Sequence, residues 1–248
     1  MARFLSRSIA ATAVIVGALS APLSAHAVVT LVGCAGSSFG SACGLDELLA
    51  GGSININGYS FSNFSVSLAG GRILDASAIR VDPIDQPSRP GFTFVDVGDT
   101  LRALNGVLSS NNLGFDIAVG GGAPPVSGAT LAMTAGQLTG TGSFANAFAD
   151  LFNPAFTTLL GNLLAYCDGS ACAGSTTSSS ASFASASAIS VVAGIDVSAA
   201  ASGAAEINAL SVVVLAPVPE PATISLLGVG LGALAWRRRK RSQQHAGH

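Results

Sequence analysis

The chain has 248 residues, of which 49% are hydrophobic and only 10% charged, and its mean hydropathy is +0.57. This composition argues against an ordinary cytosolic enzyme. Most basic residues lie near the two ends, whereas residues 28–220 contain 4 Arg, no Lys and 13 acidic residues. An acidic middle of this kind argues against a nucleic-acid partner for that region.

The positions of the histidines exclude several kinds of catalysis. All three, His26, His245 and His248, lie in the terminal segments. Residues 28–220 therefore have neither an imidazole nor an amine side chain, which excludes Ser-His-Asp and Cys-His catalysis, histidine-rich metal sites and Schiff-base chemistry there. Carboxylate chemistry, calcium binding or no chemistry remain, and no residue pattern calls for a cofactor.

The first 27 residues have the order of a secretory signal peptide. Two arginines precede an apolar stretch over residues 9–19, and an Ala-His-Ala sequence ends at Ala27. A signal peptidase requires small side chains at these positions, so we expect cleavage between Ala27 and Val28. A retained membrane anchor is the alternative, which the short apolar run disfavours because a span needs about 20 residues.

The C-terminal segment combines a proline motif, an apolar stretch and a basic cluster. The motif is Pro219-Glu220-Pro221, the apolar stretch covers residues 222–236, and the cluster is Arg237, Arg238, Arg239, Lys240 and Arg241. As a helix, residues 222–236 would be roughly 22 Å long, a short single transmembrane span. The basic cluster should stay cytoplasmic, followed by a cytoplasmic tail at 242–248.

This C-terminal arrangement over residues 217–241 resembles the PEP-CTERM sorting signal of Gram-negative bacteria. The resemblance implies recognition by an exosortase, a membrane cysteine transpeptidase found in bacteria that make extracellular polysaccharide. It also implies export through the inner membrane, transient anchoring by the helix, and a final place at the cell surface or in the extracellular matrix. The alternative is a plain C-terminal anchor that is never cleaved.

Between these ends, residues 28–216 are long enough for one domain. Its clearest strand pattern runs from Leu113 to Val119, where every second residue is apolar. Weaker patterns predict strands over residues 60–68, 77–81, 91–95, 129–133, 189–197 and 210–215, with turn residues such as Asn57-Gly58 between them. Many short strands with little helix indicate a mainly β exported domain, a sandwich or jelly roll.

Two stretches of the middle region fit this pattern less well. Phenylalanine and leucine recur at helical spacing over residues 144–164, which predicts a short helical excursion, kinked or divided at Pro154. Residues 174–205 consist mostly of Ser, Ala, Gly and Thr. We expect sheet there, because apolar residues alternate over 189–197; a flexible linker is the alternative.

The middle region also resembles, loosely, exported PEP-CTERM proteins of unassigned activity. The similar segments are residues 58–64, 78–94 and 192–197. This resemblance implies a β-rich architecture and supplies no active site.

The four cysteines form two pairs that are close in sequence, Cys34 with Cys43 and Cys167 with Cys172. An exported chain enters an oxidising compartment, so we expect two short-range disulfides. A metal site made of four thiolates is the alternative, but the spacings fit zinc ribbons poorly.

Two pairs of carboxylates are the candidate chemical groups, namely Asp82 with Asp85 and Asp96 with Asp99. Paired carboxylates can act as acid and base on a glycoside, and loop oxygens can bind Ca²⁺. Both pairs also lie in ordinary turn sequences, where a solvated aspartate needs no further role. We expect turn residues, with calcium binding and catalysis as alternatives.

These observations favour an exported, non-enzymatic surface or extracellular-matrix protein, sorted by an exosortase-type system and placed near extracellular polysaccharide. A calcium-dependent or carbohydrate-binding module is the first alternative, and a glycoside hydrolase that uses only carboxylates is the second. Apart from its phenylalanines, the mature region has only Tyr59 and Tyr166 as aromatic residues. This scarcity argues against a strong sugar-binding platform.

Overall fold

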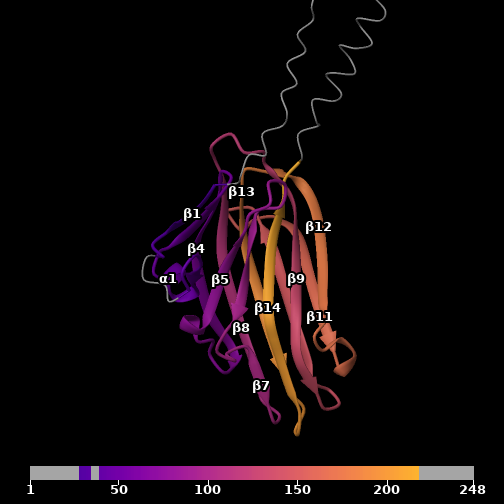
Figure 1. Ribbon diagram of the computed structural model, residues 1–248. Coiled ribbons are helices and arrows are strands. Elements are labelled where there is room, and N and C mark those ends of the chain that lie inside the picture. Colours follow the sequence, from indigo (N-terminus) through magenta and orange to yellow (C-terminus); the bar gives the residue numbers. More distant parts are fainter. Residues whose placement is uncertain (1–27, 35–38, 218–248) are drawn as a thin grey trace, which may run out of the picture.

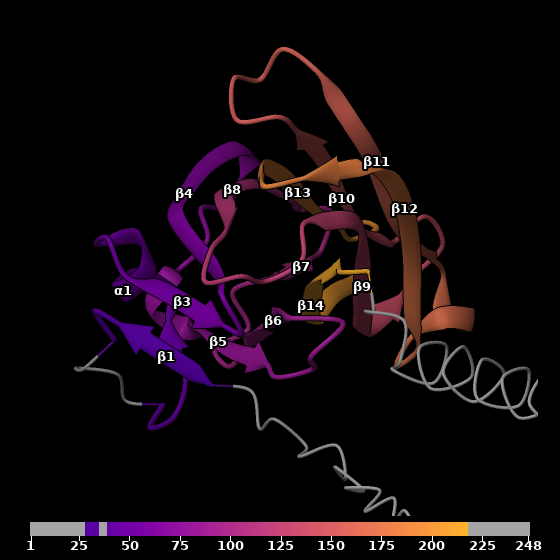
Figure 2. The same ribbon diagram turned by 90° about the horizontal axis from the view of Figure 1, so that it is seen from above.

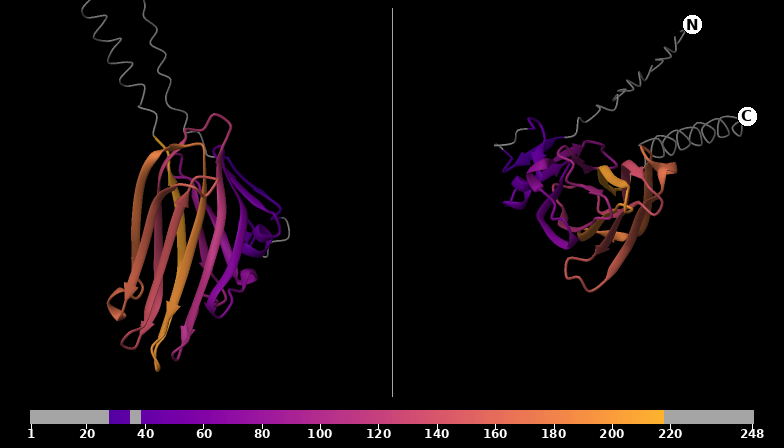
Figure 3. Two further views of the ribbon diagram at one scale, coloured as in Figure 1. Left: turned by 180° about the vertical axis from the view of Figure 1, so that it is seen from behind. Right: turned by 90° about the horizontal axis from the view of Figure 1, so that it is seen from below.

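The computed structural model describes residues 28–34 and 39–217, which form two antiparallel sheets (Figure 1). The expected signal peptide, the sorting motif from Pro219 onward and the expected helix at 222–236 lie outside these residues. Within the described ranges, no helix is both long and apolar enough to cross a membrane. The long strands of both sheets run along the length of the molecule (Figures 1 and 3).

The first sheet, called sheet A, has seven strands, which lie in the order β1, β3, β4, β8, β13, β10, β11. Their bounds are β1 (Val29–Val32), β3 (Ser53–Ile56), β4 (Tyr59–Gly71), β8 (Leu108–Val119), β13 (Ala188–Ser198), β10 (Phe144–Phe152) and β11 (Leu159–Asp168).

The second sheet, sheet B, has the order β12, β9, β14, β6, β5, β2, with β7 also paired to β14. The bounds are β12 (Thr176–Ala186), β9 (Val126–Thr139), β14 (Ala204–Leu215), β6 (Gly91–Asp96), β5 (Ile79–Ile84), β2 (Cys43–Gly44) and β7 (Arg102–Leu104). Three short helical segments complete the fold: α1 (Leu45–Leu49), η1 (Ala76–Ala78) and η2 (Ser170–Cys172).

The two sheets face each other across one hydrophobic core, as the view from above shows (Figure 2). Alternate residues of the long strands point into this core. Five phenylalanines meet there with ring centroids 4.9–5.6 Å apart, namely Phe61, Phe64, Phe92, Phe94 and Phe115. Each such ring pair contributes about 0.5–1.5 kcal/mol beyond its buried area. At one side of the molecule β11 and β12 lie next to each other and close the sandwich.

A bulge in β4 explains why two phenylalanines three residues apart both enter the core. The register with β8 shifts between Ser62 and Ser65, and Asn63 adopts a φ of 55°. Asparagine tolerates this left-handed conformation better than most residues. The Asn63 amide also donates a hydrogen bond of 2.8 Å to Asp116 on β8. The bulge reverses the inside-outside alternation, so both Phe61 and Phe64 are buried.

The predicted mainly β architecture is confirmed. Six of the seven strand patterns in the sequence fall within observed strands, the clearest one within β8, and the pattern at residues 77–81 begins in η1 and continues into β5. The expectation of sheet rather than linker at residues 174–205 is also confirmed, because that stretch forms β12 and β13. β13 is in fact a central strand, paired on both sides by β8 and β10.

The predicted helical excursion over residues 144–164 is wrong. The segment forms the antiparallel strands β10 and β11, with Pro154 in the turn between them. In β10 the phenylalanines occupy every fourth position, which lies on one face of a helix but equally on one face of a strand. The residues between them that point into the core are mainly alanines, so the sequence shows no apolar alternation at the true period of two.

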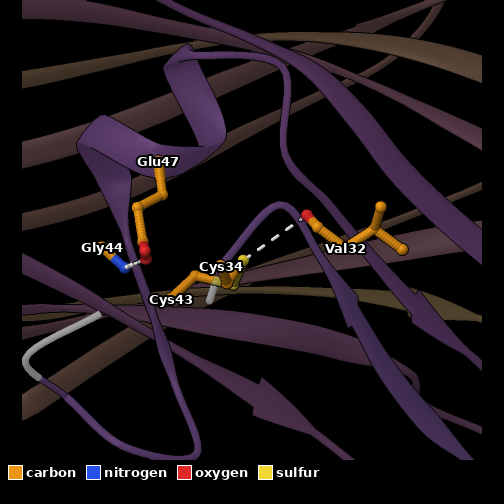
Figure 4. Close-up of a disulfide and its surroundings, with 5 residues drawn as sticks. All are labelled: Val32, Cys34, Cys43, Gly44 and Glu47. Atoms are coloured by element: carbon orange, nitrogen blue, oxygen red, sulfur yellow. Dashed lines mark hydrogen bonds between the residues drawn. A yellow bond between two sulfur atoms is a disulfide. The ribbon is translucent and has the colours of Figure 1, made fainter. Parts of the chain in front are cut away.

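Both predicted disulfides are present. Cys34 is bonded to Cys43, and Cys167 to Cys172. Figure 4 shows the first bond joining the chain after β1 to β2, just before α1, where the backbone N–H of Gly44 donates to the Glu47 carboxylate at 2.8 Å. No cysteine of the described residues is free, so the four-thiolate metal site is wrong.

Candidate functional site: an aromatic face on sheet A

The outer face of β10 carries a row of large side chains outside the core. Along this strand the odd-numbered residues are buried and the even-numbered ones are partly exposed. The outward residues are Phe144, Asn146, Phe148, Asp150 and Phe152. Because alternate residues of a strand are about 7 Å apart, the phenylalanines lie about 14 Å from one another, with one polar residue between each pair.

The edge strand β11 extends this row sideways. Leu164 lies opposite Phe148, and its side chain is 54% exposed. Tyr166 is 48% exposed and stacks on Phe144, with a centroid distance of 6.2 Å and an interplanar angle of 29°. We call Phe144, Phe148, Phe152, Leu164 and Tyr166 the aromatic face. At its far end Phe152 contacts Phe156, which is 57% exposed in the turn to β11.

A glycine of the neighbouring strand sets the position of the central ring. Gly194 on β13 lies opposite Phe148 in the register. A Cβ atom at Gly194 would collide with three atoms of the Phe148 ring, which therefore lies across the backbone of β13. The absence of a side chain at this position lets the ring rest directly on the sheet.

Polar side chains border the aromatic face on the same side of sheet A. The Asp150 carboxylate accepts a hydrogen bond from the amide of Asn162 on β11. The Asp196 carboxylate accepts one from the hydroxyl of Ser110 on β8. Asp116 accepts hydrogen bonds from Ser190 and Asn63. The face thus combines apolar ring surfaces with fixed hydrogen-bond acceptors.

A shallow polar hollow lies at one end of the face. Its volume is about 360 Å³, and its lining residues come from the β9–β10 turn, the last residue of β11 and the chain that follows it: Gly140, Thr141, Gly142, Asp168, Gly169 and Ser170. Asp168 is the register partner of Phe144, so the hollow adjoins the aromatic face.

This arrangement suits a ligand that has both apolar faces and many hydroxyl groups. Rings and leucines left outside the core form an apolar patch, and such patches mark interaction sites. Carboxylates and amides around apolar surfaces fix the orientation of a ligand through hydrogen bonds. The phenylalanine and tyrosine rings supply flat contact area, while the aspartates and asparagines supply acceptors and donors.

The carboxylate pairs singled out in the sequence do not come together. Asp82 lies in β5 and Asp85 just beyond its end, whereas Asp96 ends β6 and is paired with Ile79 at the start of β5. The two pairs therefore occupy opposite ends of the β5–β6 hairpin. Among the described residues, no three His, Cys, Asp or Glu side chains are grouped so that they could hold a metal ion.

Three of these aspartates have clear contacts within the protein. Asp82 forms an ion pair with Arg80 of the same strand at 2.8 Å, and this hydrogen-bonded carboxylate raises the pKa of Arg80. The Asp96 carboxylate accepts hydrogen bonds from the backbone N–H groups of Gly98, Thr100 and Leu101. Asp99 approaches Arg102 to 3.4 Å. These contacts are those expected of turn and surface residues.

Sequence reasoning missed the aromatic face, because it assigned the same phenylalanines to a helix. One feature of the sequence indicates a strand with large side chains on its outer face. The exclusively small residues between them at positions 145, 147 and 149 suit the inside of a thin sandwich, and they leave the larger side chains for the outside.

Comparisons with known proteins found weak structural likenesses. A CBM61 module, solved in complex with β-1,4-galactotriose, has 9% sequence identity and a TM-score of 0.30, covering 61% of this chain and 88% of that one. A CBM35 module from Cellvibrio japonicus has 15% identity and a TM-score of 0.26, covering 62% and 100%. TM-scores this low carry no weight for fold or function. No curated protein matches the chain.

The C-terminal segment gives a definite match. Residues 217–240 match the PEP-CTERM protein-sorting motif, which implies processing by an exosortase and sorting to the cell envelope or surface. The motif begins two residues after the last residue of β14, so the described domain and the sorting segment adjoin directly. The chain therefore carries a PEP-CTERM protein-sorting motif at residues 217–240, as its sequence predicts.

Proposed function

We propose that the exported domain is a non-enzymatic polysaccharide-binding protein of the cell surface or extracellular matrix, with the aromatic face of sheet A as its binding site. The observation that carries the proposal is the row of rings outside the core, bordered by aspartates and asparagines. A pyranose ring has an apolar C–H face and a rim of hydroxyl groups. The C–H face suits an aromatic ring, and the hydroxyls suit carboxylate and amide acceptors.

The open shape of the site supports a polymer rather than a small ligand. The outward side chains of β10 alone extend from Phe144 to Phe152, about 27 Å at 3.4 Å per residue. Such a length accommodates several consecutive sugar units, and the hollow beside Asp168 offers a place for a chain end or a branch.

A non-catalytic role agrees with the contacts of the acidic residues. Residues 28–217 contain no histidine or lysine to act as a base. On the same side of sheet A as the aromatic face, Asp116, Asp150 and Asp196 each accept a hydrogen bond from a hydroxyl or amide group of the protein. Carboxylates held in fixed positions in this way can orient a ligand through hydrogen bonds.

Binding to the extracellular polysaccharide of the producing bacterium tests the proposal. In affinity electrophoresis with the full chain in mild detergent, Phe148→Ala should weaken binding about tenfold, because burial of one aromatic ring contributes about 1.5 kcal/mol or more. Val97→Ala is the control, since Val97 is 48% exposed on a loop of sheet B. Equal binding by the parent and Phe148→Ala would contradict the proposed site.

The same preparation tests the non-enzymatic role. Incubation with the polysaccharide should release no reducing sugar above the level of a heat-inactivated sample. Release that disappears in Asp150→Asn or Asp196→Asn would make the carboxylate-only hydrolase the better account.

A further inference from the structure

The strands of sheet A carry charge of one sign only. They contain four aspartates, Asp116, Asp150, Asp168 and Asp196, and no Arg, Lys or Glu. All four occupy outward positions in the strand register and lie on the side of the aromatic face. In sheet B, by contrast, the strands contain both Arg80 and Arg102 beside their acidic residues.

Among the described residues, no ion pair neutralises the negative charge on this side of sheet A. Asp150 and Asp196 accept hydrogen bonds from an amide and a hydroxyl, which are neutral donors. Within residues 28–34 and 39–217, the ion pairs found are Arg80 with Asp82 and Arg102 with Asp99, both outside sheet A. Arg72 follows β4 directly, and its charge acts on Asp75.

The charges alternate with the rings in the strand register. Asp168 lies opposite Phe144, and Asp196 is paired with Asn146, one outward position further along. Asp150 lies between Phe148 and Phe152 on β10 itself. A sugar stacked on one of these rings therefore has a carboxylate nearby. The carboxylate is about 5 Å away when it lies on the neighbouring strand, and about 7 Å away when it lies two residues along the strand that carries the ring.

We infer that the aromatic face takes a polysaccharide with free amino groups in preference to a neutral or an anionic one. This inference rests on the proposed function and adds the class of ligand. A protonated amino sugar places an ammonium group within reach of the uncompensated carboxylates, whereas a uronate or sulfate would be repelled by the same groups. The stacking rings hold the sugar while the aspartates select its charge.

Three oligosaccharides of equal length separate these possibilities: a glucosamine hexasaccharide, its fully N-acetylated form and a galacturonate hexasaccharide. Calorimetry with the full chain in mild detergent should give the tightest binding for the glucosamine form, about tenfold over the N-acetylated form at low salt, because only its ammonium groups can pair with the carboxylates. The galacturonate form should bind weakest. Salt should reduce the preference, since the site is open to solvent.

The double variant Asp150→Asn, Asp196→Asn should lose most of the preference, so that it binds the glucosamine and N-acetylated forms with affinities within about twofold of each other. The double variant Asp46→Asn, Asp85→Asn is the matched control, because both aspartates are exposed, one in α1 and one beyond the end of β5, and their removal changes the net charge by the same amount. Thermal melting of each variant shows whether the fold is retained.

The outcomes distinguish this inference from the proposed function. The charge selection is overturned if the parent binds the N-acetylated and glucosamine forms equally well. The proposed binding site still stands in that case, provided that Phe148→Ala abolishes binding of the N-acetylated form. A preference that persists in the double variant also overturns the inference. Binding of none of these sugars or of the extracellular polysaccharide, or binding that Phe148→Ala does not alter, overturns both.

Discussion

At the scale of single residues, the exposed aromatic face depends on a glycine. Phe148 rests across Gly194 because no side chain intervenes, and Gly194 is itself buried beneath the ring. Gly194 does not have a positive φ, so backbone conformation does not require glycine there. The requirement comes from the close approach of a side chain in the neighbouring strand, which only the three-dimensional register reveals.

Gly194→Ala should therefore displace the Phe148 ring. We expect a loss of about 1–3 kcal/mol in the free energy of unfolding, typical of overpacking, together with weaker polysaccharide binding. Urea unfolding and affinity electrophoresis measure the two effects. Gly70→Ala in β4 is the control, since a Cβ there meets its nearest atoms at 4.0 Å.

The double variant Gly194→Ala, Phe148→Ala identifies the cause. Without the ring, the added methyl group has no ring atoms to collide with, so Gly194→Ala should cost little in that background. An equally large cost with and without Phe148 would show that the strand itself, and not the ring, rejects the methyl group.

At the scale of strands, the sequence predicts those elements in which the apolar residues point inward. The pattern from Leu113 to Val119 identifies β8 because its alternate residues Leu113, Phe115 and Ile117 are buried. The apolar pattern does not identify β10, because the arrangement of its side chains is the opposite. There the inward residues are mostly alanines and the large ones face solvent, so hydrophobicity indicates the wrong face and the wrong period.

The candidate site could not be predicted from the sequence, because its residues are brought together only by the fold. Its residues come from β10, β11, β13 and β8, and their juxtaposition depends on pairing between strands distant in sequence. The disulfides, in contrast, join cysteines that are only 9 and 5 residues apart. Such local partners need no knowledge of the fold, so their spacing, together with the expected export to an oxidising compartment, is enough to predict them.

The second disulfide stabilises the corner between β11 and β12. It closes a five-residue loop that includes η2, where the chain passes from sheet A to sheet B. Replacing both Cys167 and Cys172 with alanine should lower the free energy of unfolding by about 2 kcal/mol in the chain-entropy treatment. Urea unfolding of the oxidised parent and the variant measures the difference.

Reduction provides the control for this prediction. A reducing agent should lower the stability of the parent by more than that of the variant, since the variant retains only the Cys34–Cys43 bond. Peptide mapping without reductant should recover both bonds from the exported parent. A Cys34–Cys167 link or free thiols in that map would contradict the assigned pairing.

At the scale of the whole molecule, the binding face and the sorting motif belong to separate parts of the chain. The aromatic face lies on sheet A, whereas β14, the last strand before the motif, is an inner strand of sheet B between β9 and β6. Changes in the motif should therefore leave the sandwich and its aromatic face unaltered. Export and binding can accordingly be tested by separate sets of variants.

The sorting motif makes a prediction about the fate of the chain. The sequence Pro219-Glu220-Pro221, which lies outside the described residues, predicts an extended recognition segment, because a proline ring restricts φ and disfavours helix at the residue before it. We expect an exosortase to cut near Glu220 and release the domain from the segment that follows. Replacing both prolines with alanine should leave the precursor in the inner membrane, as fractionation of the producing bacterium would detect.

The same experiment separates sorting from folding. The variant should keep the thermal stability and polysaccharide binding of the parent, because β14 ends at Leu215, before either proline. Mass spectrometry of surface material from the parent should show a mature N-terminus at Val28 and no residues of the basic cluster at 237–241. Two results would make a permanent C-terminal anchor the better account: surface material that retains this cluster, or a proline variant that reaches the surface as efficiently as the parent. In a permanent anchor the basic residues would still hold that end of the chain on the cytoplasmic side.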